Sequence, residues 1–158
     1  MSTITYLKGD ATCPQAAGNK ILCHIVSDKG GWGKGFVVAI SKRWKTPEEE
    51  YRRWYQERTT NDFALGAVQV VQAEPDLWVA NTIGQHGMTA GSEGPPIRYE
   101  AVRQCLEKVR DKALELSASV HMPRIGCGLA GGKWPEIEKI IAETLCAANV
   151  PVFVYDFE

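Results

Sequence analysis

The sequence lacks the features that mark membrane-spanning, secreted and nucleic-acid-binding chains. It contains no run of about 18 apolar residues, so we expect no membrane-spanning helix. The segment Met1–Asp10 has no positive region followed by an apolar core, so we expect no signal peptide. The formal net charge is -1, and no lysine–arginine cluster is dense enough to predict a nucleic-acid-binding stripe.

The cysteines also lack a recognisable pattern. The five residues are odd in number, widely scattered and without the CxxC spacing of a zinc site or the framework of a small secreted protein. We therefore expect a reduced, cytoplasmic chain with no metal and no cofactor. The densest basic stretch, Lys42, Arg43 and Lys45 followed by Arg52–Arg53, is offset by Glu48–Glu50 and is typical of a solvated helical face.

The apolar pattern predicts one α/β domain over residues 1–158, with a mixed sheet between helices. Ile21–Val26 is apolar on both faces, as expected of a central strand. A helix start is predicted at Thr46, with Thr46 as N-cap, Pro47 at the first helical position and Glu49 closing a capping box. The predicted strands are Ile4–Lys8, Ile21–Val26, Ala67–Gln72, Leu77–Ile83, Val120–Ile125 and Val150–Tyr155. The predicted helices are Phe36–Trp44, Thr46–Arg58, Ile97–Leu116 and Trp134–Ala148.

Two glycine-rich loops stand between a predicted strand and a predicted helix. Gly30–Gly35 follows Ile21–Val26, and Gly126–Gly132 follows Val120–Ile125. Such a turn lets backbone N–H groups converge on an anion, and the positive end of the helix dipole adds to the attraction. Two such loops in a short chain indicate a diphosphate held from both sides, and hence a nucleotide-like ligand.

The second loop also matches the dinucleotide-binding pattern G-x-G-x-x-G through Gly126, Gly128 and Gly131, with Asp156 near the position of a ribose-binding acid. That pattern normally opens a long alternating fold, whereas here one helix and one strand remain. We therefore keep diphosphate binding and reject a nicotinamide dehydrogenase. A Walker-type phosphate loop is excluded because neither loop ends in Gly-Lys-Ser/Thr.

Several polar and aromatic side chains near these loops have two interpretations. Asp10 is either a turn residue or an acceptor for an exocyclic amine such as that of adenine, and Asp28 either a turn residue or a group that orients a water or ribose hydroxyl. Trp32 either packs over its loop as a lid or walls a ligand. Lys34 either neutralises phosphate or is a solvated helix-start lysine.

The remaining candidates are a cysteine and the histidines. Cys127 is interpreted as structural, because no base lies near it in the sequence and the turn requires a small side chain. His24 is predicted to be a satisfied core histidine, and His121 to be structural. His86 stands beside Gln85 in the long loop Gly84–Pro96 and is the histidine to consider for catalysis.

Four segments of the chain together resemble the macrodomain family, the ADP-ribose-binding three-layer α/β/α fold. They are Tyr6–Thr12, the Gly30–Gly35 loop, Met122–Leu129 (Met-Pro-Arg-Ile-Gly-Cys-Gly-Leu) and Val152–Asp156. The third segment is similar to the branch that contains the terminal ADP-ribose protein glycohydrolase and the yeast ADP-ribose-1″-phosphate phosphatase. The resemblance implies that Asp10 holds the adenine amine, that Ala11 adds a backbone contact and that Tyr155 borders the adenine. It implies a diphosphate and distal ribose enclosed by Gly33, Lys34, Gly35, Ile125, Gly126, Cys127, Gly128, Leu129 and Ala130.

The sequence departs from that branch at two positions. The terminal glycohydrolase uses a lysine in the loop after the strand matching Leu77–Ile83, and an aspartate directly after Gly-Cys-Gly-Leu; here these regions read Gly84-Gln85-His86 and Ala130. A covalent lysine–sugar intermediate is therefore not carried over. A water held by a ligand phosphate and by Asp28, Gln85 or His86 is the alternative nucleophile, attacking C1″ of the distal ribose.

Two functional hypotheses follow. The first is a monomeric hydrolase that removes ADP-ribose from glutamate or aspartate side chains of proteins, with ADP-ribose-1″-phosphate phosphatase activity as its variant. The second is a reader that binds ADP-ribose without turnover, which the missing lysine and aspartate favour. The expected partners are ADP-ribose and ADP-ribosylated proteins, with nucleic-acid-linked ADP-ribose as a further ligand class and no membrane.

Overall fold

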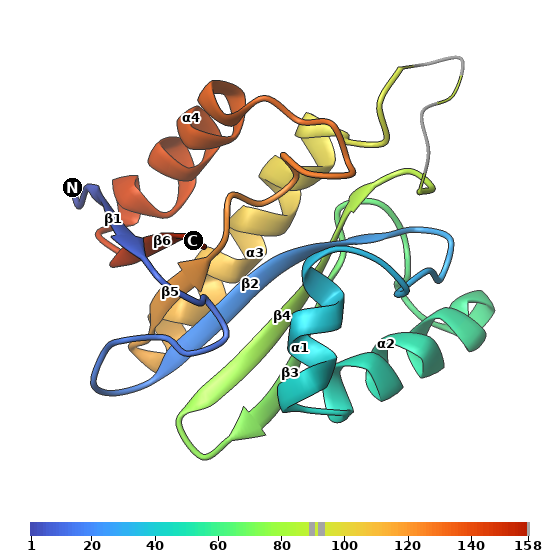
Figure 1. Ribbon diagram of the computed structural model, residues 1–158, viewed down its shortest axis with the longest axis horizontal. Helices are drawn as coiled ribbons and strands as arrows, with labels where there is room; N and C mark the ends of the chain where they lie inside the picture. Colours follow the sequence, from blue (N-terminus) through green and yellow to red (C-terminus); the bar gives the residue numbers. More distant parts are fainter. Residues whose placement is uncertain (89–90, 92–93, 158) are drawn as a thin grey trace.

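The computed structural model describes residues 1–88, 91 and 94–157, which form a six-stranded sheet between two layers of helices (Figure 1). The strands are β1 (Ile4–Lys8), β2 (Lys20–Ser27), β3 (Val68–Glu74), β4 (Leu77–Gln85), β5 (Ser119–Met122) and β6 (Val152–Asp156). The helices are α1 (Phe36–Arg43), α2 (Thr46–Gln56), α3 (Tyr99–Leu116) and α4 (Trp134–Thr144), with 3₁₀ turns over Arg58–Thr60 and Cys146–Ala148. The predicted single-domain α/β/α fold with a mixed sheet is confirmed.

The sheet has the strand order β1-β6-β5-β2-β4-β3, and β3 is its antiparallel member. The other strands run parallel, so their carboxyl ends lie at one edge. The chain segments that follow β1, β2, β4 and β5 gather there, and this is the edge at which open parallel sheets bind ligands. Both glycine loops belong to this edge.

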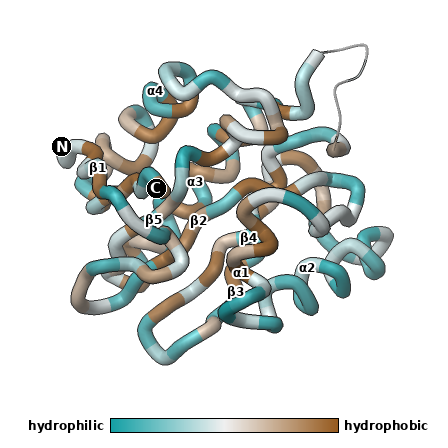
Figure 2. Tube along the Cα trace, viewed as in Figure 1, coloured by the Kyte–Doolittle hydropathy of each residue, from teal (hydrophilic) through white to brown (hydrophobic). Residues whose placement is uncertain are grey.

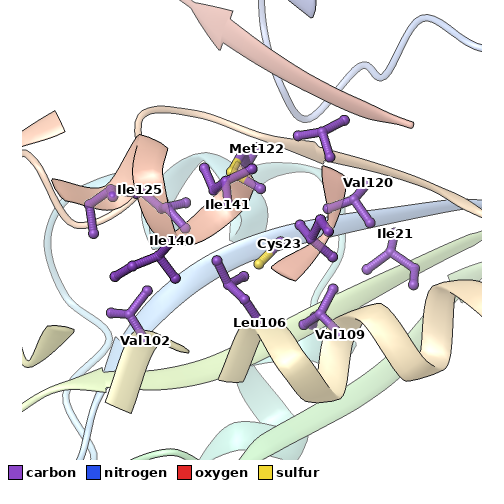
Figure 3. Packing of buried hydrophobic residues seen from close by; sticks show 14 of the residues in the cluster. Ile21, Cys23, Val102, Leu106, Val109, Val120, Met122, Ile125, Ile140 and Ile141 are labelled. Carbon is purple, nitrogen blue, oxygen red and sulfur yellow. The ribbon is translucent and has the colours of Figure 1, made fainter. Parts of the chain in front are cut away.

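Each face of the sheet buries its own apolar cluster. On one face, Ile21 and Cys23 of β2 pack with Leu106 of α3 and with Ile140 and Ile141 of α4 (Figure 3). On the other face, the alternate residues of β2 pack against α1 and α2. Buried on both faces, β2 has the continuous apolar sequence expected of a central parallel strand. Figure 2 shows hydrophobic residues along the central strands and a mostly hydrophilic α2.

The predicted strands and helices are all present, with shifts of a few residues at their ends. Strand β5 ends at Met122, not at the predicted Ile125. Pro123 explains the early end, because proline has no N–H to continue a ladder. The predicted loop Gly84–Pro96 begins later than expected, because β4 continues through Gln85; residues 89–90 and 92–93 of this loop lie outside the described residues.

The predicted capping box at Thr46 is wrong. Lys45 already has helical backbone angles, and its carbonyl accepts a hydrogen bond from the Glu49 N–H, so the helix begins one residue earlier than expected. No side chain caps α2. In the same turn, the Glu48 carboxylate accepts hydrogen bonds from the Ser41 hydroxyl and from Arg52 Nε.

Across the part of the chain that the structure describes, no helix is both long and apolar enough to cross a bilayer.

Candidate functional site

Two cavities lie at the carboxyl edge of the sheet. The first encloses about 200 Å³ between the end of β2, the Gly30–Gly35 loop, the start of α1 and the segment after β5. The second encloses about 620 Å³ between the segment after β1, the outer face of α1 and the end of β6. Phe36 and Pro123 line both, so the cavities meet. Together they form one elongated site along the carboxyl edge.

Asp10 stands in the second cavity at the exit of β1. Its Oδ1 accepts two hydrogen bonds, from the Thr12 N–H (2.8 Å) and the Thr12 hydroxyl (2.7 Å). No hydrogen bond from the described residues reaches Oδ2. Asp10 is therefore a turn residue and a cavity residue at once, with one oxygen holding the turn and the other available to a ligand.

Tyr155 forms another wall of the second cavity and is fixed by a buried polar chain. Its hydroxyl accepts a hydrogen bond from the Gln15 N–H (2.9 Å) and lies 2.8 Å from His121 Nδ1, while His121 Nε2 lies 2.8 Å from the Ser119 hydroxyl. Burial lowers the pKa of His121 to about 4, with a smaller contribution from the Lys20 charge. The imidazole is thus neutral, and its Nδ1 can accept a hydrogen bond from the Tyr155 hydroxyl.

The second glycine loop is closed by short backbone contacts. Gly126 has φ +73°, and a Cβ there would lie 2.7 Å from Ile97 Cδ1. The Gly132 N–H donates to Gly126 O (2.6 Å), and the Ile97 N–H donates to Ala130 O (3.0 Å). Gly128 in the middle of this loop has nothing within 4 Å of its Cβ position. The loop is therefore tight at its ends and open toward the cavity in the middle.

Lys34, Gly35 and Arg124 border the first cavity. Gly35 has φ +85° and precedes α1 without a side-chain cap, so the first N–H groups of α1 remain free of side-chain partners. Arg124 is held by two hydrogen bonds to Asp156, at 2.6 and 3.0 Å. Asp156 therefore pairs with an arginine, and the ribose-binding role of the dinucleotide pattern finds no support here.

Trp32 lies beneath its loop in the apolar cluster and lines neither cavity. The ring packs against His24 and Tyr51, and Nε1 donates to the Ser41 hydroxyl (2.7 Å). Of the two interpretations of Trp32, these contacts favour packing of the loop over contact with a ligand.

His24 is a core histidine, but the expectation that it is fully satisfied is wrong. The Asn81 amide donates to Pro47 O and Gln69 Oε1, so Asn81 Oδ1 must accept from His24 Nε2, at 2.5 Å. His24 Nδ1 is buried and is without a hydrogen-bond partner among the described residues. Burial lowers the pKa of His24 to about 4, and its bond to Asn81 opposes this shift.

The three catalytic candidates come together beside the first cavity. Asp28 Oδ2 lies 2.7 Å from His86 Nδ1, and Asp28 Oδ1 accepts from the Gly87 N–H (2.9 Å). Gln85 lines the cavity, and its Nε2 donates to Gly87 O (2.8 Å). Because a carboxylate can only accept, His86 carries its proton on Nδ1 and presents an unprotonated Nε2 when neutral. The arrangement can orient a water and take up its proton.

Cys127 is half-buried in the second loop. Burial raises the pKa of its thiol, and the nearby Arg124 charge only partly opposes this. The thiol is therefore protonated at neutral pH, as expected of a structural cysteine. Among the described residues, no group of histidine, cysteine and carboxylate side chains is arranged to hold a metal ion.

The structure adds site residues that the sequence did not single out. Phe36 and Pro123 lie where the two cavities meet, and Lys42 and Arg43 line the second cavity, although their sequence favoured a solvated face. An aromatic residue directly after a glycine loop was an available signal for Phe36. No local signal distinguishes Arg43, because its partners lie in the segment after β1.

Comparisons with known proteins find relatives that match almost the whole chain. No protein-family model matches the chain. The ADP-ribose glycohydrolase OARD1 of Bos taurus is 30% identical, and the alignment covers 98% of this chain and 91% of that protein. The mouse chromodomain-helicase-DNA-binding protein 1-like is 30% identical over 99% of this chain, which spans only 18% of that protein's length. An ADP-ribose 1″-phosphate phosphatase of Meyerozyma guilliermondii is 21% identical over 96% of this chain and 99% of its own.

Solved structures give closer matches. A protein of unknown function from Bacteroides thetaiotaomicron is 58% identical with a TM-score of 0.95, covering 98% of both chains. A macrodomain protein from Streptomyces coelicolor is 54% identical with a TM-score of 0.88, covering 97% of this chain and 98% of that one.

Proposed function

Because this chain belongs to the macrodomain family, we propose that its two joined cavities bind ADP-ribose and that it hydrolyses ADP-ribosyl esters on glutamate or aspartate side chains of proteins. The observation that carries the proposal is the elongated site itself. It has a carboxylate at one end, two glycine loops in the middle and the Asp28–His86–Gln85 cluster beside the other end. This order matches the order of base, diphosphate and distal ribose in the ligand.

The second cavity takes the adenosine in this proposal. Asp10 Oδ2 accepts a hydrogen bond from the exocyclic amine, and the Tyr155 ring borders the base. The diphosphate lies between the two glycine loops, where the free N–H groups at the start of α1 and the Lys34 charge attract it. Gly33 and Gly128 leave space for close approach, since nothing lies within 4 Å of either Cβ position.

The distal ribose then lies near Gln85. A water oriented by Gln85 and by the His86–Asp28 pair attacks C1″, and its oxygen bonds to that carbon. The bond from C1″ to the carboxyl oxygen breaks, and the carboxylate leaves with the electron pair. The water's proton passes to His86 Nε2 or to a ligand phosphate. A carboxylate is a good leaving group and needs no general acid, so positioning contributes much of the rate.

A covalent route through lysine is not available to the described part of this site. Lys34 is the lysine that lines the first cavity, and it belongs to the glycine loop before α1. The segment after β4 supplies Gln85 and His86 instead, and Ala130 is apolar and buried.

The test is release of free ADP-ribose from a protein mono-ADP-ribosylated on glutamate. Gly128→Glu and Gly128→Gln form a matched pair, because both side chains enter the same open space and only one carries charge. We expect the wild type to release ADP-ribose above the spontaneous rate, and Gly128→Glu to lose both binding and release. Gly128→Gln should retain more of both, because a neutral side chain does not repel the diphosphate.

Two other results would redirect the proposal. Tight ADP-ribose binding without release would make the protein a reader, which the absence of the branch's lysine and aspartate favours. Release of phosphate from ADP-ribose-1″-phosphate in preference to ester cleavage would make it a phosphatase, as the name of the yeast relative suggests. No binding of ADP-ribose would refute all three.

A further inference from the structure

Arg43, at the end of α1, reaches across the second cavity to the segment that carries Asp10. Its Nε donates to the Thr12 hydroxyl oxygen (3.0 Å), and its Nη2 bonds the Cys13 sulfur. Thr12 is 3% exposed, whereas Arg43 lies at the surface. A surface cation is thus connected to a buried hydroxyl on the wall of a cavity.

The directions of these hydrogen bonds are fixed by chemistry. Arginine can only donate, so the Thr12 oxygen accepts from Arg43, and the Thr12 hydroxyl proton is free to donate to Asp10 Oδ1 at 2.7 Å. The Thr12 N–H donates to the same oxygen at 2.8 Å. Both internal bonds therefore converge on Oδ1. The carboxylate is held in one orientation, with Oδ2 as its free acceptor.

We propose that Arg43 is a positioning residue that acts through Thr12 to aim the Asp10 carboxylate at the ligand base, and that this relay sets the preference for a base with an exocyclic amine over one with a carbonyl at the same position. The inference rests on the proposed binding of ADP-ribose. An aimed carboxylate accepts from an amine and repels a carbonyl oxygen. A carboxylate free to rotate can turn away from the carbonyl or recruit water, and it discriminates less.

A simpler reading assigns Arg43 and its neighbour Lys42 to the helix dipole alone, since both are basic residues in the last turn of α1. Lys42 lines the same cavity, and it is connected to neither Thr12 nor Asp10 by a hydrogen bond. It is therefore the matched control, because removing either cation changes the charge of the same helix turn by the same amount.

The experiment measures the dissociation constants of ADP-ribose and of inosine diphosphate ribose, whose hypoxanthine carries a carbonyl in place of the amine. Calorimetry on the full chain compares the wild type with Arg43→Met, Lys42→Met, Thr12→Val and Thr12→Ser. The specificity ratio is the dissociation constant of inosine diphosphate ribose divided by that of ADP-ribose. We expect Arg43→Met and Thr12→Val each to reduce this ratio by about tenfold, the loss expected for a hydrogen bond to a charged group. Thr12→Ser should keep the ratio, and Lys42→Met should weaken both ligands by the same factor. Arg43→Met combined with Thr12→Val should reduce the ratio no further than either alone.

The possible outcomes separate this inference from the proposed function. Failure of the wild type to bind ADP-ribose would overturn both. Tight ADP-ribose binding with an unchanged ratio in Arg43→Met, or with equal ratio losses in Arg43→Met and Lys42→Met, would overturn the relay and leave the proposed function standing. The unfolding midpoints of Thr12→Val and Thr12→Ser are measured as well, to show whether a reduced ratio of the two dissociation constants comes from unfolding of the variant.

Discussion

Asp28 and His86 are 58 positions apart in the chain, and the Asp28 carboxylate lies 2.7 Å from the His86 ring nitrogen Nδ1. The side chain of Asp28 is 14% exposed and that of His86 is 47% exposed, so the carboxylate is sheltered and the imidazole is open to solvent. The pair fixes which nitrogen carries the proton. It also connects the segment after β2 to the segment after β4 on the side where the distal ribose is proposed to lie.

We predict that Asp28→Asn lowers the rate of ester hydrolysis about 100-fold while ADP-ribose binds with little change. The asparagine oxygen can still accept from the Gly87 N–H, which leaves its amide donor facing His86 Nδ1. The imidazole then carries its proton on Nε2 and cannot accept one there. Single-turnover release of ADP-ribose measures the rate, and calorimetry measures the affinity.

His86→Gln is the companion variant to Asp28→Asn. If His86 is the base, the two single variants and their combination should lose similar amounts of rate. Full activity in His86→Gln would transfer the proton-accepting role to a ligand phosphate.

Trp32→Phe should lower the free energy of unfolding by about 1–3 kcal/mol, because it removes the buried hydrogen bond to Ser41 and part of the ring volume. The affinity for ADP-ribose should change less than about threefold, since Trp32 lines neither cavity. Urea unfolding measures the change in the free energy of unfolding, and calorimetry measures the affinity for ADP-ribose. A large loss of affinity in a stably folded variant would restore Trp32 to the ligand-binding surface.

Gly126→Ala should destabilise the protein by about 1–3 kcal/mol, because φ is +73° and the new Cβ would lie 2.7 Å from Ile97 Cδ1. Gly128→Ala is the control, since that position has no positive φ and open space around its Cβ. Its stability should remain within about 1 kcal/mol of the wild type. Equal thermal midpoints for the two variants would show that the second loop tolerates side chains at its base.

Stability should decrease as the pH falls from about 6.5 toward 4. In the folded protein, burial lowers the pKa of both His24 and His121 to about 4, whereas a histidine in an unfolded chain has a pKa of about 6.5. Between these values the unfolded chain binds more protons, so the full contribution exists above pH 6.5 and is lost as the pH approaches 4. Each imidazole should contribute a slope approaching about 1.4 kcal/mol per pH unit.

Urea unfolding at pH 7, 6 and 5 measures this slope. His121→Phe removes one of the two titrating groups. The dependence of the free energy of unfolding on pH should therefore halve, even if the variant is less stable than the wild type at every pH. A slope equal to that of the wild type would show that His121 is not neutral in the folded state at these pH values.

The fold could be predicted because its signals are local. Ile21–Val26 is apolar on both faces, and glycine turns separate strands from helices, so the order of elements follows from neighbouring residues. The predicted ends of helices and strands are wrong where a contact between residues distant in sequence determines the backbone conformation. Helix α3 begins at Tyr99, not at the predicted Ile97, because the residues before it are held in an extended conformation beside β4: Ile97 forms a bridge with Gln85, and the Arg98 N–H donates to Gly84 O.

The site could be predicted only in part. The glycine loops and Asp10 carry local patterns, and the cavities are found beside them. The pairing of Asp28 with His86 and the connection from Arg43 to Thr12 depend on which segments the sheet brings together. Local patterns contain no information on such pairings: Asp28 and His86 could be chosen as separate candidates from the sequence, but their contact could not be predicted, and Arg43 was predicted to lie on a solvated face.

Strand β1 lies at the sheet edge, where Ile4 pairs with Val152 of β6. The segment that carries Asp10 therefore takes its place only after the last strand in chain order has joined the sheet. Pairings between such distant residues form slowly, because closing a long loop costs entropy before any contact is made. A nascent chain could assemble its glycine loops around β2 and β5 on the ribosome and still be unable to hold the base. Tight binding of the whole nucleotide would then be a property that each molecule acquires only once β6 has joined the sheet, in a single late step.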